Sequence, residues 1–319
     1  MRRRSNNKSD SLDTWIKRVI RKDERELAKS KENVDGLVVG VTNTSAAVET
    51  ERGILEARLT GKPAVVGDAV TVAILENGDS AVLEVAARRT KLSRPDVDQD
   101  KTEQVIVANV DIVTIVVSVV TPPLHPRLID RYLVAIQQGG AQPLIYVNKL
   151  DLLEDHSELD VLDTYRNLGI QTIQGSAHEG LGRDDLRTAL RGKTCAFVGH
   201  SGVGKSSLVN LLKPEADLDT GALMGGYGRG AHTTTTSSLH RLADGTVLID
   251  TPGIRSFGLR ELDGSEIASY FPEFAPIACK FNDCSHIHEP GCGVLEAVES
   301  GEIDEARYDA YVRLREELG

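Results

Sequence analysis

A glycine-rich segment that ends in lysine and serine has the residue types needed to bind phosphate. Residues 199–206 read GHSGVGKS and fit the pattern G-x-x-x-x-G-K-[ST]. Glycines let backbone N–H groups turn toward phosphate oxygens, and the N-terminus of a following helix adds positive partial charge. We expect Lys205 to reach the β- and γ-phosphates and Ser206 to bind Mg²⁺. The predicted phosphate-binding residues are Gly199, His200, Ser201, Gly202, Val203, Gly204, Lys205, Ser206 and Ser207.

The segment NKLD, residues 148–151, indicates which base the nucleotide carries. Guanine offers two adjacent donors, and the carboxylate of Asp151 can accept from both, whereas adenine has no donor at N1. Asn148 can bond the other edge of the base, and the stem of Lys149 can cover its face. The segment SAHEG, at the end of the next predicted strand, strengthens this interpretation. The predicted guanine-binding residues are Asn148, Lys149, Leu150, Asp151, Ser176 and Ala177, and the ligand is GTP or GDP.

A third segment, DTPG, follows another predicted buried strand at residues 245–249. We expect Asp250 to hold Mg²⁺ through water and the N–H of Gly253 to meet the γ-phosphate. A second protein ligand for Mg²⁺ is expected from the threonine-rich segment GRGAHTTTT. Its four consecutive threonines leave open whether Thr233 or Thr234 is that ligand.

The residue after DTPG bears on catalysis. Many GTPases have a glutamine there that orients water, but this chain has Ile254, whose apolar side chain cannot do so. His232, in the threonine-rich segment, is the best candidate for the catalytic group, and a solvated loop histidine is the equal alternative. His200 and Arg229 are weaker rivals.

Three of the four cysteines lie close together near the C-terminus and indicate a metal site. The predicted Zn²⁺ ligands are Cys279, Cys284, His286 and Cys292, with His288 as the rival for the imidazole position. Three thiolates and one imidazole suit a closed tetrahedral site, which leaves no open position for water and is therefore structural. Cys195, in the strand before the phosphate loop, is predicted to be a core residue. Metal-binding rather than disulfide-bonded cysteines indicate a reducing cytosol.

The elements that position these residues form an alternating pattern. Residues 105–260 alternate predicted strands and helices, which implies a parallel sheet with helices on both faces, and all the nucleotide motifs fall at strand carboxyl ends. The guanine-binding segments come before the phosphate loop, the reverse of the order in an ordinary small GTPase. A circular permutation explains this order. It also makes the loop after DTPG, residues 254–262, a short tether that could relay nucleotide hydrolysis to the zinc-binding domain.

Charge is unevenly distributed along the chain. The 319 residues carry a net charge of −11, but residues 1–31 hold eleven Lys or Arg and five Asp or Glu, a net of +6. The remainder therefore carries −17, which argues against a uniformly basic nucleic-acid binder. Residues 11–31 predict a basic helix that either meets phosphates or docks on the next domain. The sequence contains no run of eighteen apolar residues, so no membrane span is predicted.

Five short predicted strands between residues 34 and 90 suit a small OB-type barrel. The barrel has no aromatic residue for base stacking. Contacts with the backbone or shape of RNA remain possible through Arg52, Arg58, Lys62, Arg88 and Arg89. The predicted organisation is a basic arm or helix at 1–33, the all-β barrel at 34–90, a polar linker at 91–104, a circularly permuted α/β P-loop GTPase domain at 105–262 and a mostly helical zinc-binding domain at 263–319.

With these motifs in this order, nearly the whole chain resembles the circularly permuted, ribosome small-subunit-dependent GTPases of the RsgA/YjeQ family. The resemblance implies a cytoplasmic factor that binds the small (30S) ribosomal subunit late in its maturation and does not bind a membrane. It also implies a GTPase that the subunit stimulates, with the barrel and the zinc-binding domain touching 16S rRNA. The catalytic histidine of the family falls on His232, although Ala231 replaces a basic residue that many relatives carry. We expect a monomer.

Two other classes of function compete with this reading. One is a non-enzymatic RNA-binding module, against which the intact Lys205, Ser206 and Asp250 argue. The other is a permuted GTPase that acts on the large ribosomal subunit. The N-terminal barrel and the zinc cluster favour the small-subunit type.

Overall fold

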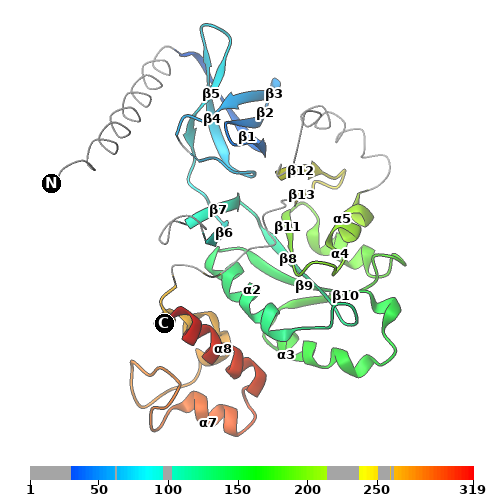
Figure 1. Cartoon of the computed structure of the whole chain (residues 1–319), viewed down its shortest axis with the longest axis vertical. Coiled ribbons are helices and arrows are strands. Elements are labelled where there is room, and N and C mark those ends of the chain that lie inside the picture. Colours follow the sequence, from blue (N-terminus) through cyan, green and yellow to red (C-terminus); the bar gives the residue numbers. More distant parts are fainter. Residues whose placement is uncertain (1–29, 62, 96–102, 214–236, 251–258, 260–261) are drawn as a thin grey trace, which may run out of the picture. The chain divides into compact units, whose positions relative to one another are not determined.

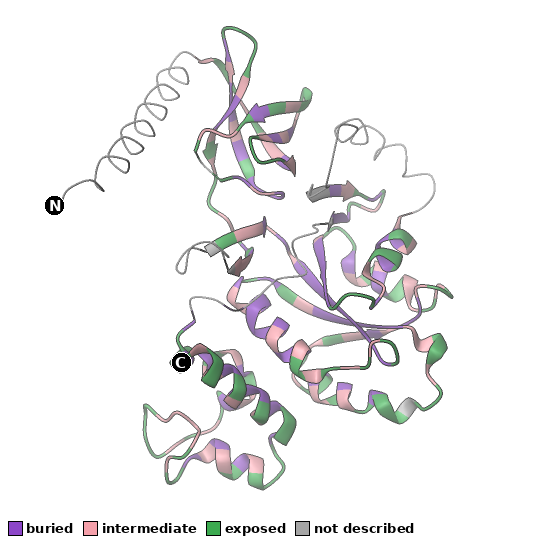
Figure 2. Ribbon diagram, viewed as in Figure 1, coloured by how far each residue is buried: buried purple, intermediate pink, exposed green. Residues whose placement is uncertain are grey.

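The computed structural model describes residues 30–61, 63–95, 103–213, 237–250, 259 and 262–319. The chain divides into two compact units, one of residues 1–88 with 235–239 and one of residues 89–234 with 240–319. Each unit has its own core of buried apolar side chains (Figure 2). Most of the helix predicted over residues 11–31 lies outside the described residues, but its last two positions belong to a strand.

The first unit is a five-stranded barrel, which confirms the OB-type prediction (Figure 1). β1 pairs antiparallel with β2 and β4, β2 with β3, and β4 with β5. A parallel contact between Arg58 of β3 and Ala81 of β5 closes the barrel. The strands are β1 (Ser30–Val41), β2 (Ser45–Thr50), β3 (Gly53–Arg58), β4 (Ala69–Leu75) and β5 (Ser80–Val85).

Small and β-branched side chains fill this barrel, and one glycine lets its strands approach. A Cβ atom on Gly36 would lie 2.5 Å from Val48 Cγ1 and 2.6 Å from the Glu49 carbonyl oxygen, so only glycine fits there. Arg88 ends the unit, and its guanidinium pairs with the buried carboxylate of Asp68 at 2.7 Å. That pairing makes Arg88 part of the barrel framework.

The second unit contains a parallel sheet in the strand order β10-β9-β8-β11-β13. Its strands are β8 (Ile112–Ser118), β9 (Gln142–Asn148), β10 (Gln171–Gln174), β11 (Thr194–Val198) and β13 (Val247–Asp250). The helices between them are α2 (Pro126–Gln138), α3 (Val161–Asn167), α4 (Arg183–Leu190) and α5 (Lys205–Leu212). The predicted alternation of strand and helix is therefore confirmed, with boundaries shifted by a few residues.

Helices cover both faces of this sheet. Leucines of α4 and α5, such as Leu186 and Leu208, share one cluster with Val116, Tyr146 and Phe197 from alternate strand positions. Helix α2 contacts β8 and β9, and its Ile129, Leu133 and Ile136 are fully or almost fully buried. The central strand β8 is buried along its whole length, as expected for a strand covered on both faces.

Three strands and a helix of the structure were not predicted from the sequence. Strands β6 (Lys91–Pro95) and β7 (Glu103–Ala108) form an antiparallel pair, so the predicted polar linker contains part of a hairpin. The first residues of β12 (Ser237–Arg241) belong to the first unit and pair with β1, through Ser237 with Val41 and Ser238 with Gly40. The short helix α7 (Gly293–Glu299) follows the last cysteine.

The C-terminal part of the second unit is built from short helices around an aromatic cluster. Two 3₁₀ segments, Gly264–Tyr270 and Pro272–Phe274, precede α7, and α8 (Glu305–Leu318) ends the chain. The rings of Phe271, Phe274 and Tyr311 pack with centroids 5.0–5.4 Å apart. Within the described ranges, no helix has the length and apolar character needed to cross a membrane.

Candidate nucleotide and metal sites

The phosphate loop connects β11 to α5, as predicted, and two of its glycines are sterically required. A Cβ atom on Gly199 would lie 2.2 Å from the Val116 carbonyl oxygen, and one on Gly204 would lie 2.2 Å from Asn148 Nδ2. Both glycines have positive φ, 141° and 94°. The Lys205 ammonium donates to the carbonyl oxygens of Gly199 and His200 at 2.8 and 2.7 Å, so the lysine lies across its own loop.

Asn148 joins the three nucleotide motifs that the structure describes in full. Its Nδ2 donates to the carbonyl oxygen of Val203 in the phosphate loop, and its Oδ1 accepts from the N–H of Ala177 in SAHEG, both at 2.8 Å. The side chain is 2% exposed. Contact of Asn148 with the edge of the base stays a prediction, and in the structure both ends of its amide hold neighbouring loops together.

The other NKLD residues lie next to the two hydrogen bonds of Asn148. Lys149 has a left-handed backbone, with φ 66°, and its ammonium donates to the carbonyl oxygen of Thr121. The N–H of Leu150 donates to the carbonyl oxygen of Gly175 at 3.1 Å. Asp151 is exposed, so its carboxylate oxygens can face a ligand.

Hydrogen bonds of buried residues hold the SAHEG loop in place. Ser176 is fully buried, and its Oγ accepts from the N–H of Glu179 at 3.1 Å. The hydroxyl of Tyr146 donates to the carbonyl oxygen of Leu181 at 3.0 Å. Burial raises the pKa of Tyr146 to about 12, so this hydroxyl remains a donor. The loop that presents Ala177 to Asn148 is therefore held by buried polar contacts.

The strands bring these motifs to one edge of the sheet. Ser118 at the end of β8 pairs in register with Asn148, Val147 pairs with Gln174, and β13, which ends at Asp250, runs parallel to β11. Carboxyl ends of parallel strands form the usual ligand-binding edge of such sheets. The remaining predicted residues of the site, which are Arg229, His232, Thr233, Thr234, Gly253 and Ile254, lie outside the described residues.

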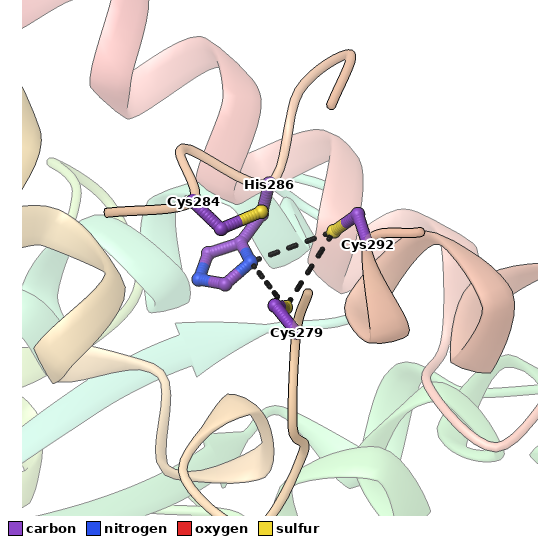
Figure 3. Close-up of side chains that lie close together, drawn as sticks. All are labelled: Cys279, Cys284, His286 and Cys292. Atoms are coloured by element: carbon purple, nitrogen blue, oxygen red, sulfur yellow. Dashed lines mark hydrogen bonds between the residues drawn. The ribbon is translucent and has the colours of Figure 1, made fainter. Parts of the chain in front are cut away.

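The predicted metal ligands Cys279, Cys284, His286 and Cys292 form one cluster, in which all ligand atoms lie within 4.8 Å of one another. Figure 3 shows their side chains converging on a common centre. The Cys279 and Cys292 sulfurs are 3.9 Å apart, and the Nδ1 of His286 lies 3.5 and 3.6 Å from them. A tetrahedral Zn²⁺ with usual bond lengths requires separations of about 3.8 Å between sulfurs and about 3.5 Å between sulfur and nitrogen. The donor set and its spacing therefore fit Zn²⁺, whereas the rival His288 is exposed and outside the cluster.

The thiols of this cluster differ in their acidity. Burial acts to raise the pKa of Cys279, but hydrogen bonds from the backbone of Val294 and Gly293 outweigh it and lower that pKa. Burial, together with hydrogen bonds with the neighbouring thiols, raises the pKa of Cys284 to about 12. A bound cation would favour the thiolate form of every cysteine around it. Cys195, by contrast, is buried in the sheet core, where burial raises its pKa to about 12, as expected for an inert thiol.

Two tyrosines that were not predicted from the sequence, together with Glu289, organise the metal-binding loop. Tyr308 and Tyr311 of α8 donate to the carbonyl oxygens of His286 and Ser285, at 2.7 and 2.5 Å. The carboxylate of Glu289 accepts from the Ser285 hydroxyl and its N–H, and these bonds lower its pKa. The tyrosines lie about twenty residues beyond the cysteines, so spacing within the cysteine segment gives no sign of them.

Comparison with known proteins adds to this geometry. The family model described as RsgA GTPase matches residues 85–260. The small ribosomal subunit biogenesis GTPase RsgA of Chlorobaculum parvum is 39% identical over 308 residues, covering 90% of this chain and 99% of that protein. The protein of the same name from Haemophilus influenzae is 40% identical over 332 residues, covering 99% of this chain and 93% of that protein.

Two solved structures share the fold. YjeQ from Thermotoga maritima has a TM-score of 0.72 at 34% identity and covers 90% of this chain and 99% of its own. YloQ, a circularly permuted GTPase, has a TM-score of 0.68 at 28% identity, and the match covers 91% of this chain and 96% of that one.

Proposed function

Because the chain belongs to the RsgA GTPase family, we propose that it is a GTP hydrolase that acts in the biogenesis of the small ribosomal subunit. The reaction converts GTP and water to GDP and phosphate. The proposal extends to a cytoplasmic, monomeric protein that binds the small subunit and contacts 16S rRNA through its barrel and its zinc-binding domain.

The observation that carries the proposal is the pair of hydrogen bonds made by Asn148. They join the guanine-binding segment to the phosphate loop, through Val203, and to SAHEG, through Ala177. These segments are far apart in sequence and occur in permuted order, yet the Asn148 side chain contacts the backbone of both other segments at one sheet edge. A strand-to-helix turn with no ligand would need no such connection to a second loop.

Each segment has a task in binding the nucleotide. The exposed carboxylate of Asp151 accepts from the two donors of guanine, which selects GTP over ATP. Lys205 and the N–H groups of residues 199–206 bind phosphate oxygens, assisted by the N-terminus of α5. Ser206 and a threonine of residues 233–234 would hold Mg²⁺, with Asp250 assisting through water, and the ion would neutralise charge that develops on the phosphates.

Hydrolysis requires a group that orients the attacking water. Ile254 cannot do so, and we assign that role to His232. The small subunit would increase turnover by bringing this histidine toward the water. Hydrolysis would then be fast only when the protein is bound to the subunit, because only then are all the catalytic groups in place.

Cosedimentation with separated ribosomal subunits tests the partner. In the presence of a non-hydrolysable GTP analogue, we expect the protein to sediment with small subunits, not with large ones, and to do so less in GDP. In a parallel assay, small subunits should increase phosphate release. Binding to large subunits alone would assign the protein to the other permuted class. Subunit binding with no nucleotide dependence and no hydrolysis would indicate a simple RNA-binding module.

A further inference from the structure

A buried cluster of charged groups joins helix α2 to helix α8. Nη1 of Arg307 lies 2.6 Å from Oδ1 of Asp130, and its Nε lies 2.8 Å from Oε1 of Glu273. The hydroxyl of Tyr165 donates to the same Asp130 oxygen at 2.9 Å. Arg307 is 4% exposed and Asp130 is 1% exposed, and the guanidinium also stacks on the ring of Phe271.

Stability alone is a poor explanation for this cluster. Burying an ion pair has a large desolvation cost, and apolar side chains of similar volume often stabilise a protein as well or better. One oxygen of Glu273 is also buried with no hydrogen-bond partner among the described residues, which adds to the cost. What ionic hydrogen bonds supply, and apolar contacts do not, is one fixed geometry between the two helices.

Helix α2 is connected to the nucleotide site at two points. The ammonium of Lys149, from the guanine-binding segment, donates to the carbonyl oxygen of Thr121 in the turn before the helix. On the helix itself, burial raises the pKa of Tyr132, and the charge of Arg131 and a hydrogen bond with the backbone of Gly199 oppose this rise. Gly199 is the first residue of the phosphate loop. A shift of α2 would therefore displace both the guanine-binding segment and the phosphate loop.

Helix α8 is connected to the metal site in the same way. Arg307 is followed on this helix by Tyr308 and Tyr311, which donate to the carbonyl oxygens of His286 and Ser285. His286 has a φ of 60°, uncommon for a residue other than glycine, so its position depends on such support. The same helix therefore holds a metal ligand at one point and Asp130 at another.

We propose that the cluster of Arg307, Asp130, Glu273 and Tyr165 couples the zinc site to the guanine nucleotide site, so that each ligand strengthens the binding of the other. Arg307 is a positioning residue in this device and contacts neither ligand. The inference rests on the proposed function, because it needs both ligands to bind. It adds a second connection between the two sites, through packed helices, to the covalent tether of residues 254–262.

Linkage makes the proposal measurable in two independent ways. If zinc raises GDP affinity by some factor, GDP must raise zinc affinity by the same factor. The full-length protein is prepared with zinc and after removal of zinc by a chelator. GDP affinity is measured with a fluorescent GDP analogue, and zinc affinity with a chromophoric chelator, with and without saturating GDP. We expect equal factors of at least about fivefold.

Three variants then locate the coupling. Asp130→Asn keeps the size of the side chain and removes its charge, and should bring both factors close to one. Tyr165→Phe removes one hydrogen bond from the cluster and should reduce them in part. Arg131→Gln is the matched control, because Arg131 and Glu317 form an exposed ion pair between the same two helices, at 2.6 Å, and its loss should leave both factors unchanged.

The outcomes separate the two proposals. A protein that binds neither GDP nor zinc would refute the proposed function. Binding of both, with factors of one in the wild type, would overturn the coupling alone. Wild-type factors that persist in Asp130→Asn would show that another element carries the coupling. If that variant does not fold, Tyr165→Phe decides, since unchanged factors in it contradict the proposal and reduced factors support it.

Discussion

Replacement of Asn148 by alanine separates two roles that this residue could have. The side chain is buried, and its amide bonds Val203 and Ala177 rather than solvent. Asn148→Ala removes both hydrogen bonds and leaves a carbonyl oxygen and an N–H group without their partner. If Asn148 organises the site, the variant should lose stability before any nucleotide is added.

The size of the loss follows from the two orphaned groups. Val203 is 2% exposed, so its carbonyl oxygen is left unsatisfied at a cost of about 1–3 kcal/mol. Ala177 is partly exposed, and water can replace some of its bond, so that end costs about 0.5–1.5 kcal/mol. The two costs add to about 1.5–4.5 kcal/mol, which should lower the Tm of the second unit by roughly 3–18 °C.

Nucleotide binding should weaken as a consequence. The loops that Asn148 joins must be ordered when GDP binds, and each 1.4 kcal/mol corresponds to about a factor of ten. The Kd for GDP should therefore rise by at most about 10- to 1,600-fold. The preference for guanine over adenine should remain, because Asp151 is intact.

Thermal unfolding without nucleotide and titration with GTP and ATP provide the assay. Asp151→Asn is the matched control from the same segment, because Asp151 is exposed and its replacement should leave the Tm unchanged. That variant should lose its preference for GTP and gain binding of xanthosine triphosphate, whose base presents a carbonyl in place of a donor. An Asn148→Ala protein with wild-type Tm and altered base discrimination would show that Asn148 reads the base, and the structural reasoning would be refuted.

Three further perturbations address the metal, the catalytic group and the sheet. Cys284→Ser should release zinc and loosen residues 270–300 because a structural site supplies folding free energy, while GDP still binds; metal analysis that finds one zinc retained would contradict this. His232→Ala should lower subunit-stimulated turnover by about 10²–10⁴-fold with little change in nucleotide affinity, and an unchanged rate would transfer the role to another group. Burial acts to raise the pKa of Asp244, but hydrogen bonds with Thr246 and Arg187 outweigh it and lower that pKa. The Asp244 carboxylate therefore stabilises the fold above its unfolded pKa and loses this effect as pH falls through the lowered folded pKa. Asp244→Asn should flatten that part of the curve of stability against pH. An identical pH dependence of stability in both proteins would contradict the assignment.

Local sequence was sufficient for the elements whose signal lies in neighbouring residues. The phosphate loop is a strand, a glycine turn and a helix in succession, and the structure has β11 and α5 with the loop between them. The barrel strands and the alternation of strand and helix follow from short periodic patterns in the same way. The four metal ligands also lie within fourteen residues, so their types and spacing were enough to predict the cluster.

Long-range contacts decided the rest. The side chain of Asn148 can reach a base or a neighbouring loop, and only the register of β8, β9 and β11 puts Val203 beside it. Asp130 and Arg307 are separated by 177 positions, and each is an ordinary charged helical residue when read alone. The hairpin of β6 and β7 was missed because its polar sequence resembles a linker until the two strands pair. Sequence thus determined the chemistry that individual segments can perform. Only the tertiary structure determined which polar groups become buried together, because burial and pairing depend on residues distant in the chain.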